Sequence, residues 1–217
     1  MTLPTILVTG FEPFGGEPVN PSWEIARALD GWTCEGHVVR SALLPCVFVD
    51  ALHRLDEAIA AHRPDLVMCL GQAGGRAEIS IERAALNVDD ARIPDNLGRQ
   101  PLDAAVVPDG PAAYFSTLPI KAIARDLREA GVAAAVSNTA GTFVCNHVFY
   151  GLMHRLATTL ARASGGFVHV PFTPEQVAGK TGLPSMPLHT QIDGIRRALR
   201  SAVLTRVDLR ETGGREH

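Results

Sequence analysis

The sequence has little that would direct it to a membrane or to nucleic acid. Its 217 residues include 20 lysines and arginines against 23 acidic residues, and the basic residues form no block that would attract a polyanion. No apolar run reaches the length of a membrane span, and no basic segment precedes the apolar residues 3–8. We therefore expect a cytoplasmic protein that binds neither nucleic acid nor membrane.

Cysteine is scarce, which limits metal and disulfide chemistry. Cys34, Cys46, Cys69 and Cys145 are far apart and form no C-x-x-C pair. Structural zinc sites and disulfide frameworks use closer or regular spacings. The sequence therefore predicts free thiols in a reducing compartment, with no metal site.

Nucleotide-binding motifs are also missing. Residues 10–17 contain glycines, but Gly16 and Glu17 stand where a phosphate-binding loop needs Lys followed by Ser or Thr, and no G-x-G-x-x-G pattern occurs. The same loop carries Phe11 and Phe14 directly after an apolar strand. These rings are equally compatible with ligand contacts and with covering the edge of a core.

Apolar segments of strand length alternate with helical patterns along the whole chain. This order predicts a three-layer α/β/α sandwich around a mostly parallel, twisted sheet. No linker or internal repeat interrupts it, so we expect a single domain over residues 1–209 and a frayed polar tail over 210–217. The predicted strands are 6–9, 38–43, 65–71, 79–87, 133–136 and 165–171, and the predicted helices are 21–29, 47–61, 119–130, 145–160, 173–177 and 188–204.

Cys145 is the first candidate for chemistry, because it lies where a strand and a turn of small residues lead into a helix. Unpaired N–H groups and the positive end of the helix dipole meet in the first helical turn. This position predicts a thiolate nucleophile, with the same N–H groups available to an oxyanion. A small buried hydrophobic residue is the alternative interpretation of a single cysteine.

Two further residues complete a possible catalytic set. His169 lies in an apolar strand, and Glu82 lies in a segment with strand-like alternation. If the carboxyl ends of separate strands converge, Cys145, His169 and Glu82 can act as nucleophile, base and orienting carboxylate. A satisfied core histidine and a surface ion pair between Glu82 and Arg83 remain alternatives.

His147 competes with His169 for the role of base. It follows Cys145 by two residues on a helix and therefore points to a different face. The same geometry argues against a metal site formed by Cys145, His147 and His154. His189, which follows a loop, is not excluded by pattern alone.

Seven blocks of sequence are similar to the pyroglutamyl peptidase I family, cysteine peptidase family C15. They occur in a consistent order from the first strand to about Gln176. The blocks are residues 10–16 with 20–23, then 71–76, 82–87, 91–96, 110–114, 137–147 and 167–171.

The resemblance implies a cysteine-type omega peptidase that removes an N-terminal pyroglutamate from peptides through a thioester. It implies Cys145 as nucleophile, His169 as general base and then acid, and Glu82 as the residue that orients the imidazole. It further implies no metal or organic cofactor, pyroglutamyl peptides as substrates, and a homo-oligomer, with a tetramer as the family's tendency.

The resemblance also implies a pocket for the lactam ring. Pyroglutamate is flat and uncharged, so its recognition needs apolar walls and a few hydrogen bonds. An aminopeptidase for free ammonium groups would need a carboxylate instead, and the first loop contains Glu12 and Glu17, which leaves that possibility open. The implied pocket residues are Phe11, Phe14, Asn20, Gln72, Ile93, Phe143 and Val144, with Arg92 beside the scissile carbonyl.

Two other classes of function fit the predicted fold. A nucleoside phosphorylase or a related α/β enzyme would share the layered architecture, since a fold does not fix a function. A catalytically silent lactam-binding or structural protein would use Cys145 only as a core residue.

Overall fold

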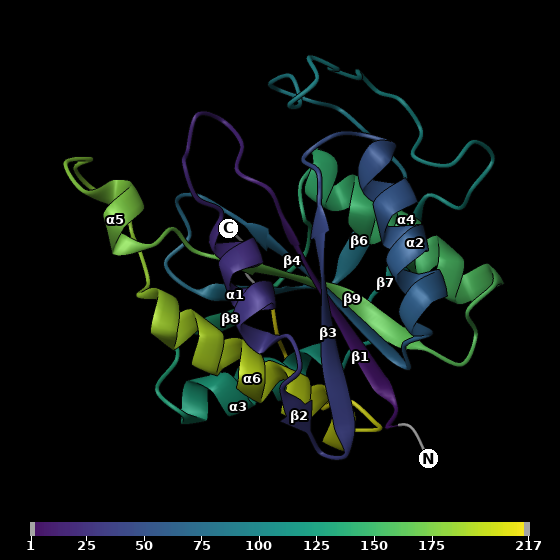
Figure 1. Cartoon of the computed structure of the whole chain (residues 1–217), viewed down its shortest axis with the longest axis vertical. Coiled ribbons are helices and arrows are strands. Elements are labelled where there is room, and N and C mark those ends of the chain that lie inside the picture. The colour runs from purple at the N-terminus through teal and green to yellow at the C-terminus, as the bar shows by residue number, and fades with distance from the viewer. Residues whose placement is uncertain (1–2, 215–217) are drawn as a thin grey trace.

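Strands and helices alternate along residues 3–214, the part of the chain that the computed structural model describes (Figure 1). The strands are β1 (Thr5–Phe11), β2 (Thr33–Cys34), β3 (His37–Leu44), β4 (Leu66–Gln72), β5 (Ile79–Glu82), β6 (Ala84–Leu86), β7 (Ala113–Phe115), β8 (Ala134–Ser137) and β9 (Ser164–Val170). The helices are α1 (Pro21–Leu29), α2 (Asp50–His62), α3 (Ile120–Glu129), α4 (Val144–Thr158), α5 (Pro174–Val177) and α6 (Leu188–Leu204).

Seven strands form the main sheet in the order β2-β3-β1-β4-β9-β5-β8. β3, β1, β4 and β9 pair in parallel, as do β5 and β8. β5 pairs with β9 in the antiparallel sense, and so does β2 with β3. The expectation of a mostly parallel sheet is confirmed, with one reversal of direction in its interior between β9 and β5.

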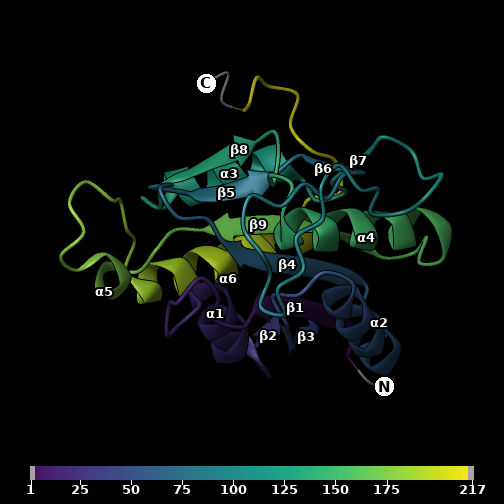
Figure 2. The same ribbon diagram turned by 90° about the horizontal axis from the view of Figure 1, so that it is seen from above.

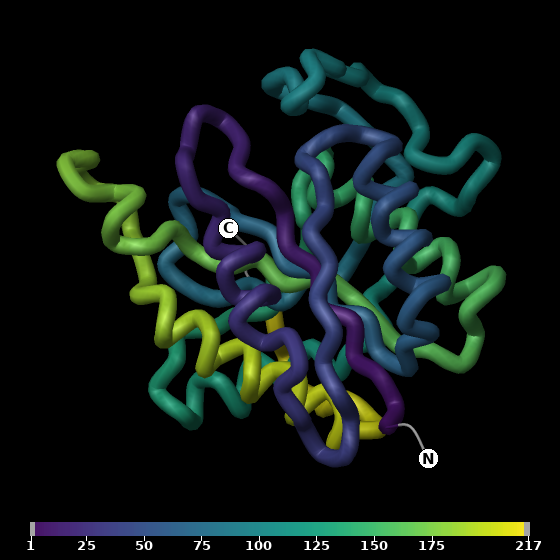
Figure 3. Tube along the Cα trace, viewed as in Figure 1, coloured from purple at the N-terminus to yellow at the C-terminus, as the bar shows by residue number. Residues whose placement is uncertain are grey.

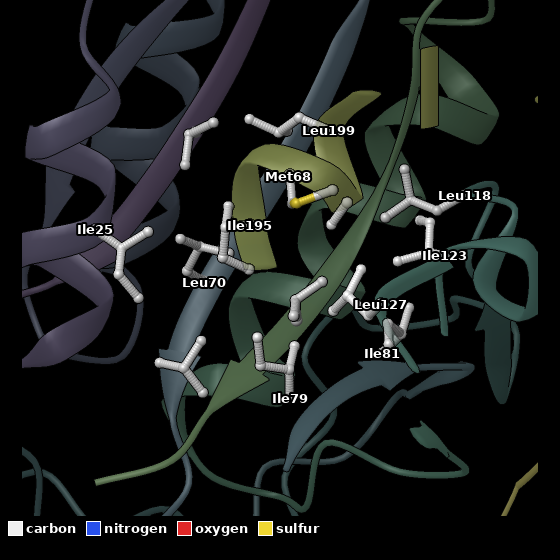
Figure 4. Packing of buried hydrophobic residues seen from close by; sticks show 14 of the residues in the cluster. Ile25, Met68, Leu70, Ile79, Ile81, Leu118, Ile123, Leu127, Ile195 and Leu199 are labelled. Carbon is white, nitrogen blue, oxygen red and sulfur yellow. The ribbon is translucent and has the colours of Figure 1, made fainter. Parts of the chain in front are cut away.

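Helices cover both faces of this sheet, with α1 and α6 on one side and α2 and α4 on the other (Figure 2). Alternate residues of a strand point to opposite faces. In β1, Ile6 and Val8 enter the core beneath α1, α3 and α6, whereas Leu7 and Phe11 enter the core beneath α2 and α4. Ile25, Ile123 and Ile195 from the three helices pack in the first core against Met68 and Leu70 of β4 and their neighbours (Figure 4).

Two predicted elements differ from the observed ones because tertiary contacts bind their ends. The helix expected from residue 47 begins at Asp50, since Val49 adopts φ 68° and its N–H donates to His147 Nε2 at 3.1 Å. The single strand expected over 79–87 is divided into β5 and β6. The break is at Arg83, whose carbonyl accepts from Ser116 of the chain leading out of β7.

Two long loops lie at the same end of the sheet, after β1 and between β6 and β7 (Figure 3). Residues 87–112 contain no helix or strand beyond an isolated bridge between Asp89 and Ala104, which agrees with the irregular excursion predicted there. Side chains hold this loop in place: Asp95 Oδ2 accepts from Phe48 N at 3.0 Å. The loop is therefore fastened to the start of α2 rather than free.

The polar tail is only partly covered by the structure. The carbonyl groups of Glu211 and Gly213 accept hydrogen bonds from Lys121 and Arg83. The predicted tail therefore contacts the body of the protein at these two residues, while 215–217 lie outside the described part. No helix within residues 3–214 combines the length and the apolar character needed to cross a bilayer.

Candidate functional site

His169 and Glu82 meet on one face of the sheet. β9 lies between β4 and β5, so His169 pairs with Gly71 on one side and Ser80 on the other. Glu82 is two residues beyond Ser80 and projects from the same face. Its Oε1 lies 2.8 Å from His169 Nδ1, which places a carboxylate against the imidazole.

The reason for this convergence differs from the expected one. The sequence argument used carboxyl ends of parallel strands, but β5 runs opposite to β9. Glu82 ends its strand while His169 is the residue before the end of β9. The two side chains meet because an antiparallel neighbour brings a diagonal pair together on one face.

Glu82 is completely buried, yet it is held ionised. Burial alone raises the pKa of Glu82, but the hydrogen bond and charge of His169, a hydrogen bond from Ser137 and the charge of Arg76 together outweigh burial and hold the pKa below its usual range. Arg76 Nη1 donates to Glu82 Oε1 at 2.7 Å. The pair is an interior ion pair and not the surface pair with Arg83 that the sequence left open.

Cys145 is the second residue of α4 and approaches β4 closely. A Cβ added to Gly71 would lie 2.9 Å from Cys145 Sγ and 2.8 Å from Phe167 Cζ. Only glycine leaves room for the sulfur at this point. Since Gly71 is the register partner of His169, the thiol and the imidazole occupy neighbouring places on the same face.

Burial opposes the ionisation that is expected for the Cys145 thiol. Desolvation raises the pKa of Cys145 above its usual range, and Cys46 and Glu82 add to the increase, while Arg76 opposes it. Burial therefore outweighs the helix N-terminus, although Cys145 keeps some exposed surface. Burial therefore favours the neutral thiol, from which a base would take the proton before the sulfur attacks.

Aromatic rings surround the thiol and imidazole. The Phe167 ring lies 4.9 Å from the His169 ring and 6.4 Å from the Phe11 ring, measured between centroids. Phe14 is 6.4 Å from Phe143 by the same measure. Phe167 was not predicted as a site residue, although its place two residues before His169 on a strand puts it on the same face.

Arg92 and Ile93 lie beside the approach to α4. Asp90 N donates to the Thr142 carbonyl at 3.0 Å, and Thr142 Oγ1 donates to the Asp90 carbonyl at 2.8 Å. This double contact joins the long loop to the turn just before Cys145. Arg92 is exposed and Ile93 is half-buried, whereas Val144 has no exposed surface and belongs to the core beneath α4.

Two predicted pocket residues use their side chains elsewhere. Asn20 Oδ1 accepts from Ser22 N at 3.1 Å, which caps α1, and Asn20 Nδ2 donates to the Glu12 carbonyl at 3.0 Å. Gln72 Oε1 accepts from Gln176 Nε2 at 2.9 Å. Gln72 alternates with Gly71, so its side chain points to the opposite face of the sheet from Cys145.

The backbone N–H and C=O of Gln72, unlike its side chain, face the region where β1 and β4 separate. Pairing between β1 and β4 stops at Thr9 and Cys69, after which β1 continues beside β3 to Phe11 and β4 beside β9 to Gln72. Parallel strands direct successive backbone groups to alternate sides. Ala73 N–H bonds toward β9, so the groups of Gln72 face the opening between β1 and β4. Open α/β sheets bind ligands at such separations.

The carboxylates of the first loop are both engaged. Glu12 Oε1 accepts from Cys46 N at 3.0 Å and from Asn96 Nδ2 at 2.8 Å. Glu17 Oε1 pairs with Lys180 Nζ at 2.7 Å. Neither group is an unpaired anion waiting for the ammonium group of a peptide.

His147 takes part in a separate buried pair. Its Nδ1 lies 2.7 Å from Asp89 Oδ2, and its Nε2 accepts from Val49 N. The adjacent Asn146 donates to the carbonyls of Leu86 and Val88, both at 2.9 Å. Both side chains fasten the loop after β6 to α4, and sequence reasoning missed this role. Within residues 3–214, no group of three or more His, Cys, Asp or Glu side chains could hold a metal ion.

Comparison with known proteins gives a consistent result. The family model described as pyroglutamyl peptidase matches residues 4–205. A pyrrolidone-carboxylate peptidase of Cupriavidus taiwanensis is 59% identical over 216 residues, covering 99% of this chain and 100% of the relative. The crystal structure of pyroglutamyl peptidase I from Bacillus amyloliquefaciens is similar with a TM-score of 0.94 and 46% identity, covering 98% of this chain and 100% of that one. Pyrrolidone carboxyl peptidase from Thermococcus litoralis is similar with a TM-score of 0.90 and 38% identity, covering 93% and 94%.

Proposed function

This chain belongs to the pyroglutamyl peptidase family and is a cysteine-type omega peptidase that removes an N-terminal pyroglutamate, and we propose that Cys145, His169 and Glu82 carry out the hydrolysis. The observation that carries these roles is the contact of His169 with the ionised, buried Glu82, beside a Cys145 sulfur that lies against Gly71. This arrangement contains an attacking group, a base and an orienting group.

In the first half of the reaction, His169 activates the neutral thiol. Glu82 holds the proton on Nδ1, so the lone pair of Nε2 is free to take the proton of Cys145 as the sulfur attacks the pyroglutamyl carbonyl. His169 then gives this proton to the departing amine, and a thioester remains. Water, deprotonated by His169, hydrolyses the thioester in the second half.

The charge that develops on the carbonyl oxygen needs donors. The N–H groups in the first turn of α4 have no partner within the helix and surround Cys145. We assign the oxyanion to these groups, with Arg92 close to it. Support for Arg92 comes from the double contact between Asp90 and Thr142, which holds its segment against this turn.

The opening between β1 and β4 fits the lactam ring. Phe11, Phe14, Phe143 and Ile93 supply apolar walls, while Val144 supports them from the core. The backbone of Gln72 offers one donor and one acceptor, which matches the lactam C=O and N–H. Asn20 acts at a distance, since its side chain fixes the loop that carries Phe14.

Discrimination against proline is the sharpest test of this pocket. Prolyl amides lack the lactam oxygen and carry a charged nitrogen, so backbone groups of the pocket would lose a partner. We expect kcat/KM for a prolyl-aminocoumarin amide to be lower than that for the pyroglutamyl amide by roughly 10,000-fold. Release of aminocoumarin in reducing buffer with a metal chelator measures both rates. Equal rates would contradict the lactam pocket.

The engaged carboxylates also argue against a general aminopeptidase. Such an enzyme would need a free anion for the substrate ammonium, and Glu12 and Glu17 already have partners. Because the chain belongs to the pyroglutamyl peptidase family, neither a nucleoside phosphorylase nor a catalytically silent binding protein is needed to explain its fold.

We also propose that the chain forms a homo-oligomer, with a tetramer as the expected state, and acts in the cytoplasm. The loop between α5 and α6 extends from the body of the molecule (Figure 1) and carries Leu183, which is 40% exposed. Burial of this loop between copies would remove apolar surface from water. Light scattering coupled to chromatography should give a mass several times that of the chain, and a monomer alone would contradict the proposal.

A further inference from the structure

Arg76 contacts two of the three segments that carry the candidate site. It follows the glycine-rich turn after β4, and its Nη1 donates to Glu82 Oε1 at 2.7 Å. Its Nη2 also reaches the carbonyl oxygen of Thr139 at 3.5 Å. Thr139 belongs to the turn that leads to Cys145, so one guanidinium contacts β5 and the approach to α4 together.

The donors to Glu82 are few for a buried anion. Arg76 Nη1 and His169 Nδ1 both approach Oε1, at 2.7 and 2.8 Å. Oε2 is buried and has no hydrogen-bond partner within residues 3–214. The Ser137 hydroxyl donates to the Thr139 carbonyl at 3.1 Å, and its hydrogen bonding to Glu82 also helps to lower the pKa of that carboxyl. Removal of Arg76 would take the guanidinium donor away from a fully buried carboxylate and leave it with His169 and the shared Ser137 hydroxyl.

We propose that Arg76 is a positioning residue of the hydrolysis, which holds Glu82 in the rotamer that orients His169. The inference rests on the proposed roles of Cys145, His169 and Glu82. Arg76 acts through Glu82 and extends the chain of contacts from the imidazole to the protein surface, where 31% of its side chain is exposed.

The pH dependence of activity follows from the groups around Glu82. The charged or titratable groups that face it are His169 from β9, Arg76 from the turn after β4 and Cys145 from α4. Without Arg76, burial favours the neutral carboxyl, so Glu82 takes up a proton at higher pH. A protonated Glu82 no longer holds the His169 Nδ1 proton as an acceptor. The acid limb of the pH profile should therefore move to higher pH.

The test compares wild type with Arg76→Ala across the pH range. We expect kcat of the variant to fall roughly 10- to 100-fold, the loss of one hydrogen bond to a charged group. KM should stay within about twofold, because Arg76 acts on a group that does not bind the lactam. The acid limb of the kcat profile should lie at higher pH in the variant than in wild type.

Chemical rescue separates positioning from a structural role. Because the Arg76 side chain is partly exposed, added guanidinium ions can enter the space left by Arg76→Ala and should raise its kcat severalfold. Arg83→Ala is the matched control, since Arg83 is adjacent to Glu82 in sequence but donates to the Gly213 carbonyl at the other end of the chain. Its kcat should stay at the wild-type value and should not respond to guanidinium.

Each other outcome overturns one claim. A folded Arg76→Ala with wild-type kcat and pH profile contradicts the role of Arg76, as does a loss of kcat with neither a pH shift nor rescue. If thermal melting shows that the alanine variant does not fold, Arg76→Gln carries the same expectations for kcat and pH. An inert wild type would instead contradict the proposed function, which keeps the two failures distinct.

Discussion

Replacement of Cys145 by serine should lower kcat/KM for a pyroglutamyl amide by at least about 1,000-fold. The reason is chemical, because the serine hydroxyl has a far higher pKa than a thiol and His169 must remove its proton in the same dry position. The change removes no packing volume of consequence, so the melting temperature should stay close to that of wild type. Release of aminocoumarin from the amide measures the loss, and thermal unfolding measures the fold.

Cys46→Ser is the matched control for this experiment. Cys46 is another buried thiol close enough to influence Cys145 electrostatically, but its backbone N–H, not its sulfur, contacts Glu12. We expect this variant to keep most of its activity. Full activity of Cys145→Ser, or an equal loss in both variants, would remove Cys145 from the role of nucleophile.

Gly10→Ala should be the most destabilising single methyl addition near the site. α1 crosses β1 so closely that the new Cβ would lie 2.4 Å from the Ser22 carbonyl oxygen and 2.5 Å from Trp23 N. Both are backbone atoms of the first turn of α1 and cannot rotate away. We expect a loss of at least about 3 kcal/mol in the free energy of unfolding, which corresponds to a fall in Tm of roughly 6–12 °C.

Gly213→Ala provides the comparison. The added Cβ would lie 3.6 Å from Lys121 Cγ, an ordinary contact with a flexible side chain. Its Tm should stay within about 2 °C of wild type. Equal Tm values for both variants would show that α1 can shift away from β1, and that the contact at Gly10 does not hold the first loop in place.

Local signals in the sequence predicted the helices well where those signals were complete. Pro21 indicated the start of α1, and the structure has it as the first helical residue, while the cap that Asn20 provides was not predicted. α6 has the predicted bounds, Leu188 to Leu204, because its apolar stripe is regular and Pro187 precedes it. The layered architecture followed from the alternation of such elements.

The arrangement of the site was less accessible to sequence reasoning. Strand direction depends on how the chain crosses between elements, and nothing in residues 79–82 shows that β5 runs opposite to β9. The pKa of Cys145 also depends on burial by neighbours from distant segments, which a rule about helix ends does not include. Arg76 had no assigned role, because its partner Glu82 becomes a neighbour only when β5 joins the sheet.

The place of β9 has a consequence for the way the chain acquires activity. β9 is the last strand in sequence, yet it lies in the interior of the sheet between β4 and β5. A chain still growing on the ribosome therefore has two separate strand groups, β2-β3-β1-β4 and β5-β8, with no strand to join them. Contacts over such sequence distances form slowly, as for Glu82 and His169, which are 87 positions apart. Cys145, the proposed nucleophile, is synthesised before His169, the proposed base, and we expect the peptidase to stay silent until the strand that completes the sheet also delivers His169.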